Sequence, residues 1–285
     1  MIKEFNPEDF LKNTDESINK YYSEVSVVGK DIYRYSQFEL KEQTLIPLLF
    51  STLYDKTIKG CLLMEKSFFK KYESVKKLKE QFISTGDGGF QIFDNPFDSL
   101  IFTTFFKTNV KLYNSKTKPK SAEHDVLISL RDIIGPIELR FCNTFDFVTK
   151  FENNYFGPAI INNARILSKD NLNRFLLDEN TVNWFESEFG ALENLLVFDI
   201  EKLKNISILK DLKLTNKSES YLFNTGVKRI LNLDLLKIGN ISAKNGSKFS
   251  IFNLHIQLIV NISGNSKNVI EMVATVGNLN TKGLE

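Results

Sequence analysis

Short apolar runs with two-residue alternation and longer runs with helical spacing follow one another along the first two thirds of the chain. The β-branched run EVSVVG predicts a first strand that stops near Gly29, and Pro47 is expected to kink the following helix or to lie in its first turn. The other predicted elements come in chain order. They are helices at 38–56 and 67–82, two strands around the glycine turn at 83–93, a helix at 94–114, a polar loop at 114–125, a β-hairpin at 135–157, and helices at 158–169 and 180–189.

Strands interleaved with helices, together with at least one hairpin, are typical of an α/β (α+β) fold, and we expect helices to cover one face of the sheet. Beyond residue 200 the chain becomes rich in β-branched residues, Asn, Ser and Gly, which predicts a small β-rich unit. We therefore divide the chain into a polar lead at 1–20, a main domain at 21–200 and a β-rich extension at 201–285. The extension could sense a ligand or aid dimerisation, but its simplest role is to cover the sheet.

Composition and charge exclude several classes of protein. With 42% hydrophobic and 25% charged residues, the 285-residue chain has the make-up of a folded globular protein, and its net charge of +2 argues against non-specific nucleic-acid binding. Two cysteines exclude a four-cysteine zinc site, and two histidines supply no histidine cluster. No apolar run reaches the roughly 18 residues of a membrane helix, and the polar first residues do not resemble a signal peptide. A cytoplasmic location is the expectation.

The stretch ISTGDGGFQIF places Gly86, Gly88 and Gly89 around Asp87. A tight hairpin turn explains this pattern, because Asp-Gly and Gly-Gly supply the positive φ that such turns require. A second interpretation is that the turn holds a carboxylate at the end of the sheet, where it could bind a metal. A Walker-type phosphate loop is excluded at this turn, since no Gly-Lys-Ser/Thr follows.

Three blocks, in this order, resemble the class III nucleotidyl cyclases, which include the adenylate and guanylate cyclases. VSVVGKDIYRYS is similar to the family's first strand, and Asp31 with the Ile32 carbonyl takes the metal-binding positions. STGDGGFQIF resembles the central hairpin that carries the second metal ligand, matched by Asp87. YFGPAIINNARI resembles a later block that contains Gly157 and Arg165. The resemblance covers roughly residues 23 to 190.

The resemblance implies a ferredoxin-type sheet and the conversion of a nucleoside triphosphate to a 3′,5′-cyclic monophosphate plus pyrophosphate. It also implies two Mg²⁺ or Mn²⁺ ions, which prefer oxygen ligands, and a loop carrying Tyr33 and Tyr35 over the triphosphate. Arg165 would stabilise the transition state at the α-phosphate. The family further implies a homodimer in which the metal-binding acids of one protomer face Arg165 of the other. A lysine that contacts the triphosphate is expected between residues 202 and 217.

The match departs from the family pattern at three positions. Ile161 occupies the place of the transition-state asparagine, and the adjacent Asn162 is rotated by about 100° around the helix axis. The two base-recognition positions hold Ile83 and Asn154, which fit neither the adenylate nor the guanylate rule. This pattern resembles the bacterial pyrimidine cyclases of antiphage defence, which make cyclic UMP or cyclic CMP for a separate effector. A purine cyclase with an unusual pocket, or a domain that binds nucleotide without turnover, are the alternatives.

Overall fold

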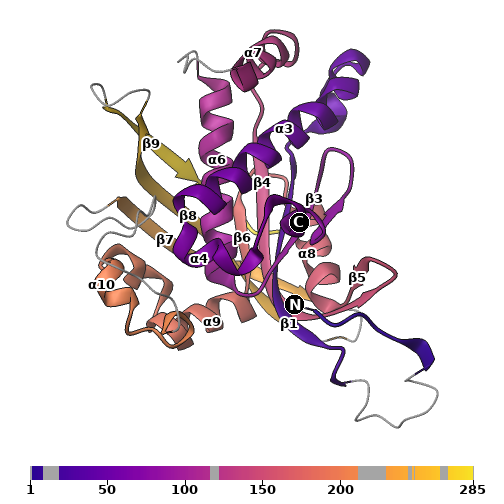
Figure 1. The fold of residues 1–285 in the computed structure, drawn as a ribbon, viewed down its shortest axis with the longest axis vertical. Coiled ribbons are helices and arrows are strands. Elements are labelled where there is room, and N and C mark those ends of the chain that lie inside the picture. Colours follow the sequence, from indigo (N-terminus) through magenta and orange to yellow (C-terminus); the bar gives the residue numbers. More distant parts are fainter. Residues whose placement is uncertain are drawn as a thin grey trace.

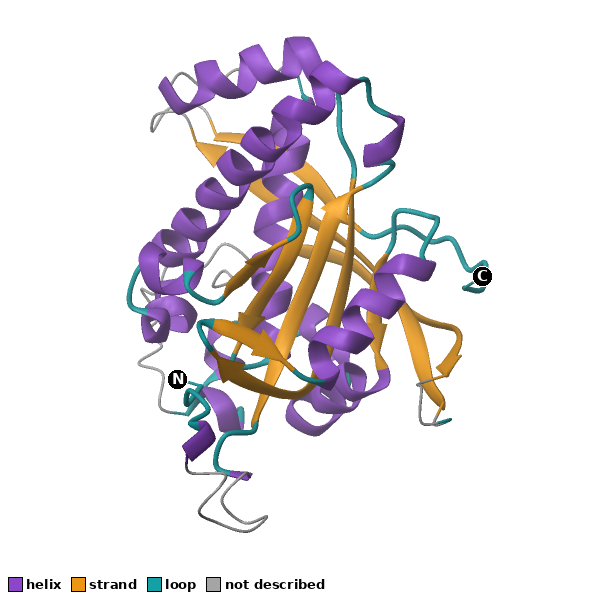
Figure 2. Cartoon of the chain, turned by 90° about the vertical axis from the view of Figure 1, so that its right-hand side faces the viewer, coloured by secondary structure: helices purple, strands orange, loops and turns teal. Residues whose placement is uncertain are grey.

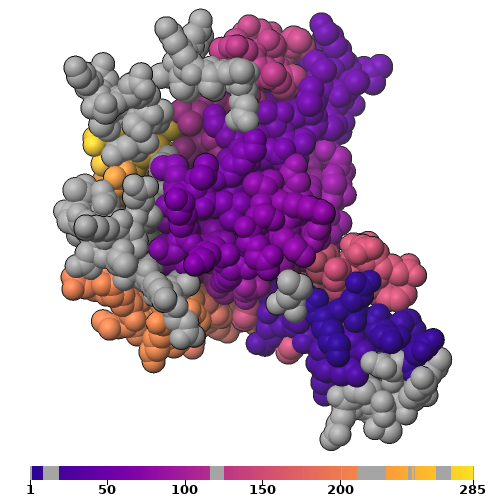
Figure 3. Space-filling view, viewed as in Figure 1, coloured from indigo at the N-terminus to yellow at the C-terminus, as the bar shows by residue number. Residues whose placement is uncertain are grey.

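The computed structural model describes residues 2–8, 19–115, 122–210, 229–242, 246, 248–263 and 269–284. Most of the predicted polar lead lies outside these ranges, as do residues 211–217 of the segment in which we expect a triphosphate-binding lysine. Residues 2–8 form a bridge with the main domain, because the Phe5 amide donates to the Lys150 carbonyl at 2.6 Å. In the space-filling view this segment, in indigo, lies beside the hairpin formed by β4 (Leu139–Phe151) and β5 (Asn154–Phe156) (Figure 3).

Within the described residues, nine strands form one mixed sheet (Figure 1). Neighbouring strands pair antiparallel, except for the parallel pair β4 and β6 (Phe175–Asp178), which are connected through helix α8 (Pro158–Lys169). The strands in spatial order are β2 (Phe82–Ser84), β3 (Gly88–Phe93), β1 (Ser23–Ile32), β4 (Leu139–Phe151), β6 (Phe175–Asp178), β8 (Lys248–Ser263) and β7 (Ile230–Ser242), with β5 (Asn154–Phe156) on β4 and β9 (Val269–Val276) on β8.

Helices cover both faces of this sheet (Figure 2). On one face, Val28, Phe93 and Phe141 belong to the large core shared with α3 and α6. On the other, Val27 and Cys142 lie in two smaller clusters that α8 completes. The prediction that helices cover only one face is therefore wrong, because α8 lies on the other face.

The helices are α3 (Leu40–Met64), α4 (Lys66–Phe69), α5 (Val75–Lys79), α6 (Pro96–Asn114), α7 (Ala122–Ile134), α8 (Pro158–Lys169), α9 (Glu179–Phe189) and α10 (Ile200–Leu203), with short 3₁₀ turns at Tyr35–Gln37, Lys70–Tyr72, Leu192–Leu196 and Ser207–Leu209.

Strand β1 does not stop near Gly29 but continues to Ile32. Gly29 lies inside the strand because Asn163 of α8 packs directly over it: a Cβ at this position would be 1.8 Å from the Asn163 Oδ1. The glycine is thus a site of close helix-to-sheet approach and not a strand end. Its presence lets the strand carry Asp31 and Ile32 to the edge of the sheet.

Two predicted elements differ from the structure through local backbone features. The helix expected at 67–82 is broken into α4, a 3₁₀ turn and α5, because Glu73 adopts a φ of 60° and Ser74 begins α5 as an N-cap that accepts the Lys77 amide. The polar loop expected at 114–125 gives way to α7 from Ala122 onward, and residues 116–121 lie outside the described residues. Pro47 lies in the interior of α3 and not in its first turn.

The strands predicted after residue 200 are present as β7, β8 and β9. β8 pairs antiparallel with β6, with Leu176 opposite Asn253, so these strands continue the central sheet across the predicted boundary at 200. Among the described helices, none combines the length and the apolar character that crossing a membrane requires.

Candidate active site

Asp31 and Asp87 are 56 positions apart in the sequence, and the β1–β3 pairing brings them together. Asp31 lies opposite Gly88 in this antiparallel ladder, and the Ile32 amide donates to the Asp87 carbonyl at 3.2 Å. Gly88 is required by this approach, since a Cβ there would lie 2.1 Å from the Lys30 carbonyl oxygen and 2.7 Å from the Asp31 Cα. The glycines therefore form the turn and also admit Asp31 against it. Both interpretations of the turn agree with this geometry.

Arg140 is a part of this site that the sequence analysis missed. It lies opposite Asp31 in the β1–β4 ladder, and its Nε and Nη2 donate to the two Asp31 carboxylate oxygens at 2.6 and 2.9 Å. Its Nη1 donates to the Asp170 carbonyl at the end of α8. An arginine within the otherwise apolar start of β4 is the only signal in the sequence, and its role emerges only from the register with β1.

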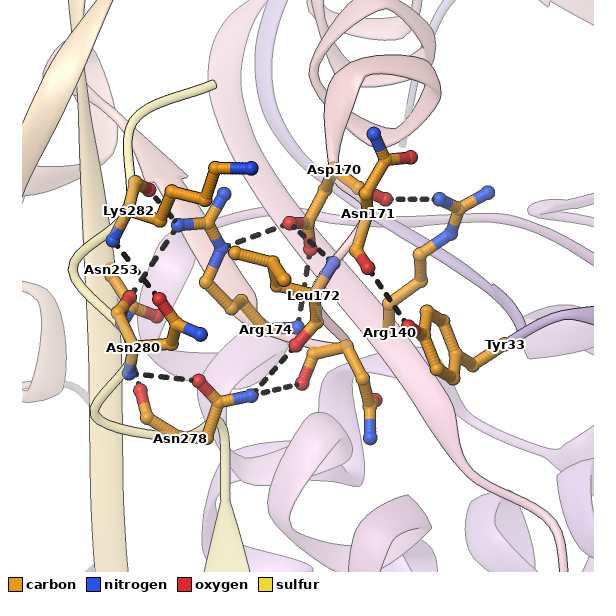
Figure 4. Close-up of polar contacts among 11 residues, drawn as sticks. Tyr33, Arg140, Asp170, Asn171, Leu172, Arg174, Asn253, Asn278, Asn280 and Lys282 are labelled. Carbon is orange, nitrogen blue, oxygen red and sulfur yellow. Dashed lines mark hydrogen bonds and ion pairs between the residues drawn. The ribbon is translucent and has the colours of Figure 1, made fainter. Parts of the chain in front are cut away.

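A cavity of about 420 Å³ opens beside these residues. Tyr33 forms one wall, and its hydroxyl donates to the Asn171 carbonyl at 2.8 Å (Figure 4). Arg34 has left-handed backbone dihedrals and places its guanidinium 4.9 Å from the centre of the Tyr33 ring. The described residues that line the cavity are Ile32, Tyr33, Arg34, Tyr35, Ser36, Gln37, Asp87, Arg140 and Asn171.

Burial raises the pKa of Asp31, and the negative charge of Asp87 adds to the rise, while the hydrogen bond and the charge of Arg140 oppose it. Burial also raises the pKa of Asp87, which the charge of Arg140 opposes. Among the described residues, Asp87 has no ion-pair partner within 4.0 Å, although it lines the cavity. The charge of Asp87 acts unfavourably on ionised Asp31, and a divalent cation bound beside both carboxylates would relieve this repulsion.

The donor set fits a hard divalent cation. The Asp31 and Asp87 carboxylates and the Ile32 carbonyl would supply oxygen ligands of the kind that Mg²⁺ and Mn²⁺ prefer. The described residues hold no group of three or more His, Cys, Asp or Glu side chains placed to bind a metal, so phosphate oxygens of a ligand would have to complete the coordination. In the structure the guanidinium of Arg140 occupies both Asp31 oxygens, and a metal bound to Asp31 would share that carboxylate with it.

The remaining predicted site residues do not line this cavity within the described part of the chain. Ile161 and Arg165 are spaced by four residues on α8; Ile161 is 50% exposed, and Arg165 donates to the Asn162 Oδ1 at 3.3 Å. The inward face of α8 instead carries Asn163, which donates to the Val27 and Cys142 carbonyls. Asn162 lies within α8, which runs without interruption from Pro158 to Lys169.

The two predicted base-recognition residues lie on different strands, β2, which pairs with β3, and β5, which pairs with β4. Ile83 is in β2 and packs, partly buried, against the apolar cluster of Val25, Val27 and Ile92. Asn154 is exposed at the start of β5, where its Oδ1 accepts the Tyr155 amide. Neither residue offers a buried polar group toward the cavity beside Asp31.

Lys30, the neighbour of Asp31, points to the opposite face of β1. It is 1% exposed, and its Nζ lies 4.6–5.4 Å from the ring centres of Phe82, Phe102 and Tyr54. Burial lowers the pKa of Lys30 well below its usual range. Because successive strand residues face opposite sides, Asp31 reaches the cavity while Lys30 is held in the core.

No protein-family model matches the chain, and no curated protein matches it. Solved structures do match over most of the chain. One is an adenylate/guanylate cyclase/hydrolase from Silicibacter pomeroyi, with 12% identity over 82% of this chain and 96% of that chain and a TM-score of 0.43. Another is the guanylyl cyclase Cya2, with 8% identity over 82% of this chain and 92% of that chain and a TM-score of 0.43. The adenylyl cyclase CyaB from P. aeruginosa gives 12% identity, 82% and 94% coverage and a TM-score of 0.42.

Proposed function

We propose that the chain is a nucleotidyl cyclase. The ribose 3′-oxygen of a nucleoside triphosphate forms a bond to the α-phosphorus, the bond from that phosphorus to the bridging oxygen breaks, pyrophosphate leaves, and the 3′-hydroxyl proton passes to solvent. The observation that supports this proposal is the convergence of Asp31 and Asp87, with Arg140, beside a cavity at one edge of the sheet. A bound Mg²⁺ or Mn²⁺ pair would supply charge neutralisation and orientation for the phosphates.

The chain's own residues have separable tasks in this proposal. Asp31, Asp87 and the Ile32 carbonyl would hold the metal ions. Arg140 is the cation already at the site, and its planar guanidinium suits phosphate oxygens. The loop with Tyr33 and Tyr35 closes the side of the cavity over the triphosphate.

A homodimer completes the site in this proposal, with Arg165 and Asn162 reaching the acids of the second protomer. The outward orientation of Ile161, at 50% exposure, and the exposed rings of Phe147 and Phe156 on the neighbouring hairpin support a second copy on this side. Mixing Asp87→Asn protein with Arg165→Ala protein tests the arrangement. Each variant alone should be inactive, whereas mixed dimers contain one intact site and should restore about a quarter of the wild-type activity. Two inactive variants that stay inactive as verified mixed dimers would contradict a shared site.

The proposed substrate is a pyrimidine nucleotide, UTP or CTP, and the proposed product acts on a separate effector in antiphage defence. This choice is motivated by Ile83, which lacks the polar side chain that the adenylate and guanylate rules place at this position. A purine cyclase with an unusual pocket is the alternative. Purified protein incubated with each of the four NTPs and Mn²⁺ should give cyclic UMP or cyclic CMP as the main product by mass spectrometry. Cyclic AMP or cyclic GMP as the main product would select the purine alternative.

The metal-dependent reaction is tested by Asp87→Asn. This variant should lose product formation by at least about a hundredfold, because the amide carries no charge for a divalent cation. Asp132→Asn, the same change at an exposed position of α7, is the matched control and should retain activity. The pairing of Arg140 with both Asp31 oxygens also suits a domain that binds nucleotide without turnover. An NTP that raises the melting temperature but is not consumed would favour that second function.

A further inference from the structure

A polar segment at residues 277–284, here called the strap, lies against the loop at residues 170–174 that leads from α8 to β6. The strap begins at Gly277, whose φ is 71° and whose hydrogen faces the Leu254 carbonyl; a Cβ there would be 2.0 Å from that oxygen. This turn lets the chain leave β9 and fold back over β8. Asn253 of β8 then holds the strap, because its Nδ2 donates to the Asn278 and Asn280 carbonyls at 2.7 and 3.1 Å.

The loop is bound from two sides at once. Four successive carbonyl groups accept hydrogen bonds: those of Asp170 and Asn171 from the active-site side, and those of Leu172 and Asn173 from the strap. Arg140 donates to Asp170 and Tyr33 to Asn171, whereas the Asn278 Nδ2 donates to both Leu172 and Asn173 at 2.8 Å. Figure 4 shows the loop between the strap residues on one side and Arg140 and Tyr33 on the other.

A buried ion pair anchors the same loop. Arg174 is 1% exposed, and its Nε donates to the Asp170 carboxylate at 2.9 Å. Its Nη1 reaches out to the strap, where it donates to the Asn280 and Lys282 carbonyls. Its own carbonyl accepts the amide of Phe141, the residue next to Arg140, at 2.9 Å. A single residue, through its side chain and its carbonyl, thus connects the strap, the loop and the strand that carries Arg140.

We propose that the strap positions the active site: Asn278 and Arg174 hold the 170–174 loop so that Arg140 and Tyr33 face the triphosphate. They are positioning residues, since they contact the loop and not the cavity. The proposal rests on the proposed nucleotide site for its effect on activity. The structural part of the proposal does not depend on that site, because the loop carbonyls hold Arg140 and Tyr33 in place whichever ligand the cavity binds. Peptide planarity couples the two sides, because rotation of the freed Asn173 carbonyl turns the Arg174 amide, which donates to the Asp170 carboxylate at 3.1 Å.

Asn278→Asp tests this coupling with almost no change in shape. The carboxylate replaces the donor NH₂ by an oxygen that faces two carbonyl oxygens, so both hydrogen bonds are lost and replaced by repulsion. Asn278→Ala removes the same bonds without repulsion and should have a smaller effect in the same direction. Asn278→Gln retains the donor and should recover part of the loss. Thr281→Ala, at an exposed strap position, is the control and should leave every readout unchanged.

Hydrogen exchange gives the readout that does not depend on catalysis. In Asn278→Asp, peptides covering residues 31–35 and 139–142 should exchange at least about tenfold faster, while peptides from α3 retain the wild-type rate. Faster exchange confined to the strap and the 170–174 loop would overturn the proposal. Faster exchange in α3 as well would show that the whole fold unfolds more readily, and this result would also overturn the proposal.

The kinetic readout then connects the coupling to function. With the NTP that the wild type consumes, Asn278→Asp should lower kcat/KM by about tenfold to a hundredfold, well below the melting temperature. Unchanged kcat/KM together with faster exchange at 31–35 and 139–142 would overturn the functional part. If the wild type consumes no NTP, the cyclase proposal fails, and the exchange experiment still decides whether the strap holds Arg140 and Tyr33. The Arg174→Lys variant repeats the test with the charge retained.

Discussion

Asp178 is an N-cap carboxylate that the structure buries almost completely, at 3% exposure. It precedes α9, and its Oδ1 accepts the Thr181 amide at 2.9 Å and the Phe145 amide at 3.3 Å. Burial raises the pKa of Asp178 from 3.8 to about 7, although the hydrogen bonds from Thr181 and Phe145 oppose the rise. Its ionisation must therefore be linked to the stability of the fold.

The direction of this linkage follows from proton counts. Because the pKa is higher in the folded than in the unfolded chain, the folded state retains a proton between about pH 4 and pH 7 that the unfolded state has released. The free energy of unfolding must then decrease as the pH rises through this window. A gap of about 3 pKa units corresponds to about 4 kcal/mol, of which about 3 kcal/mol should be lost between pH 5 and pH 8.

Asp178→Asn isolates this contribution, because asparagine keeps the acceptor for the two amides and does not ionise. Urea unfolding from pH 5 to pH 8, followed by the fluorescence of Trp184 in α9, measures the free energy of unfolding at each pH. The variant should lack most of the decrease seen in the wild type and be the more stable protein at pH 8. Asp199→Asn is the control: it is also an N-cap, bonded to the Lys202 amide at 2.8 Å, but solvent-accessible, and it should not make the protein more stable than the wild type at pH 8. A variant with the wild-type slope, or with lower stability at pH 8, would refute the reasoning.

Three further changes test the surroundings of Asp31. Lys30→Met should raise the free energy of unfolding at pH 7 by about 1–2 kcal/mol in urea titrations, because the Nζ is buried without a hydrogen-bond partner; a decrease would contradict this. Gly88→Ala should lower it by about 1–3 kcal/mol, since the added Cβ meets the β1 backbone, and an unchanged melting temperature would contradict that packing. Arg140→Lys should lower kcat/KM by about tenfold or more, because an ammonium cannot bond both Asp31 oxygens and the Asp170 carbonyl together; unaltered kinetics would remove Arg140 from the site.

The parts of the site that local sequence chemistry specifies could be predicted. Asp87 belongs to a glycine turn, so its neighbours alone place it between two strands, whereas Asp31 is assigned by the resemblance to the cyclases, because the β-branched run alone predicts a strand that stops near Gly29. The hairpin and the helix that starts at Pro158 also have local signals, and both are confirmed. Whether Arg165 and Asn162 meet the acids of a second copy stays a prediction.

The parts that depend on register and long-range contact could not be predicted. Arg140 meets Asp31 only because β4 pairs with β1 in one register, and no feature of its own segment shows this. The segment DNLNR at 170–174 looks like an ordinary polar loop, and its importance comes from Asn278, more than a hundred positions later. Hydrogen bonds to backbone carbonyls leave no residue-type signature on the accepting side, so the loop sequence carries no record of its partners.

The register of β1 explains how one strand serves both the core and the candidate site. Side chains alternate between the two faces of a sheet, so a slip by one residue would place Asp31 beneath the rings that cover Lys30 and bring Lys30 to the cavity. Two close approaches oppose such a slip. Gly29 admits Asn163 on the α8 side, and Gly88 admits the Asp31 backbone from β3, and only glycine at each position avoids a Cβ within 2.1 Å of a neighbouring atom. Gly29 and Gly88 therefore fix which face of the sheet receives the carboxylate.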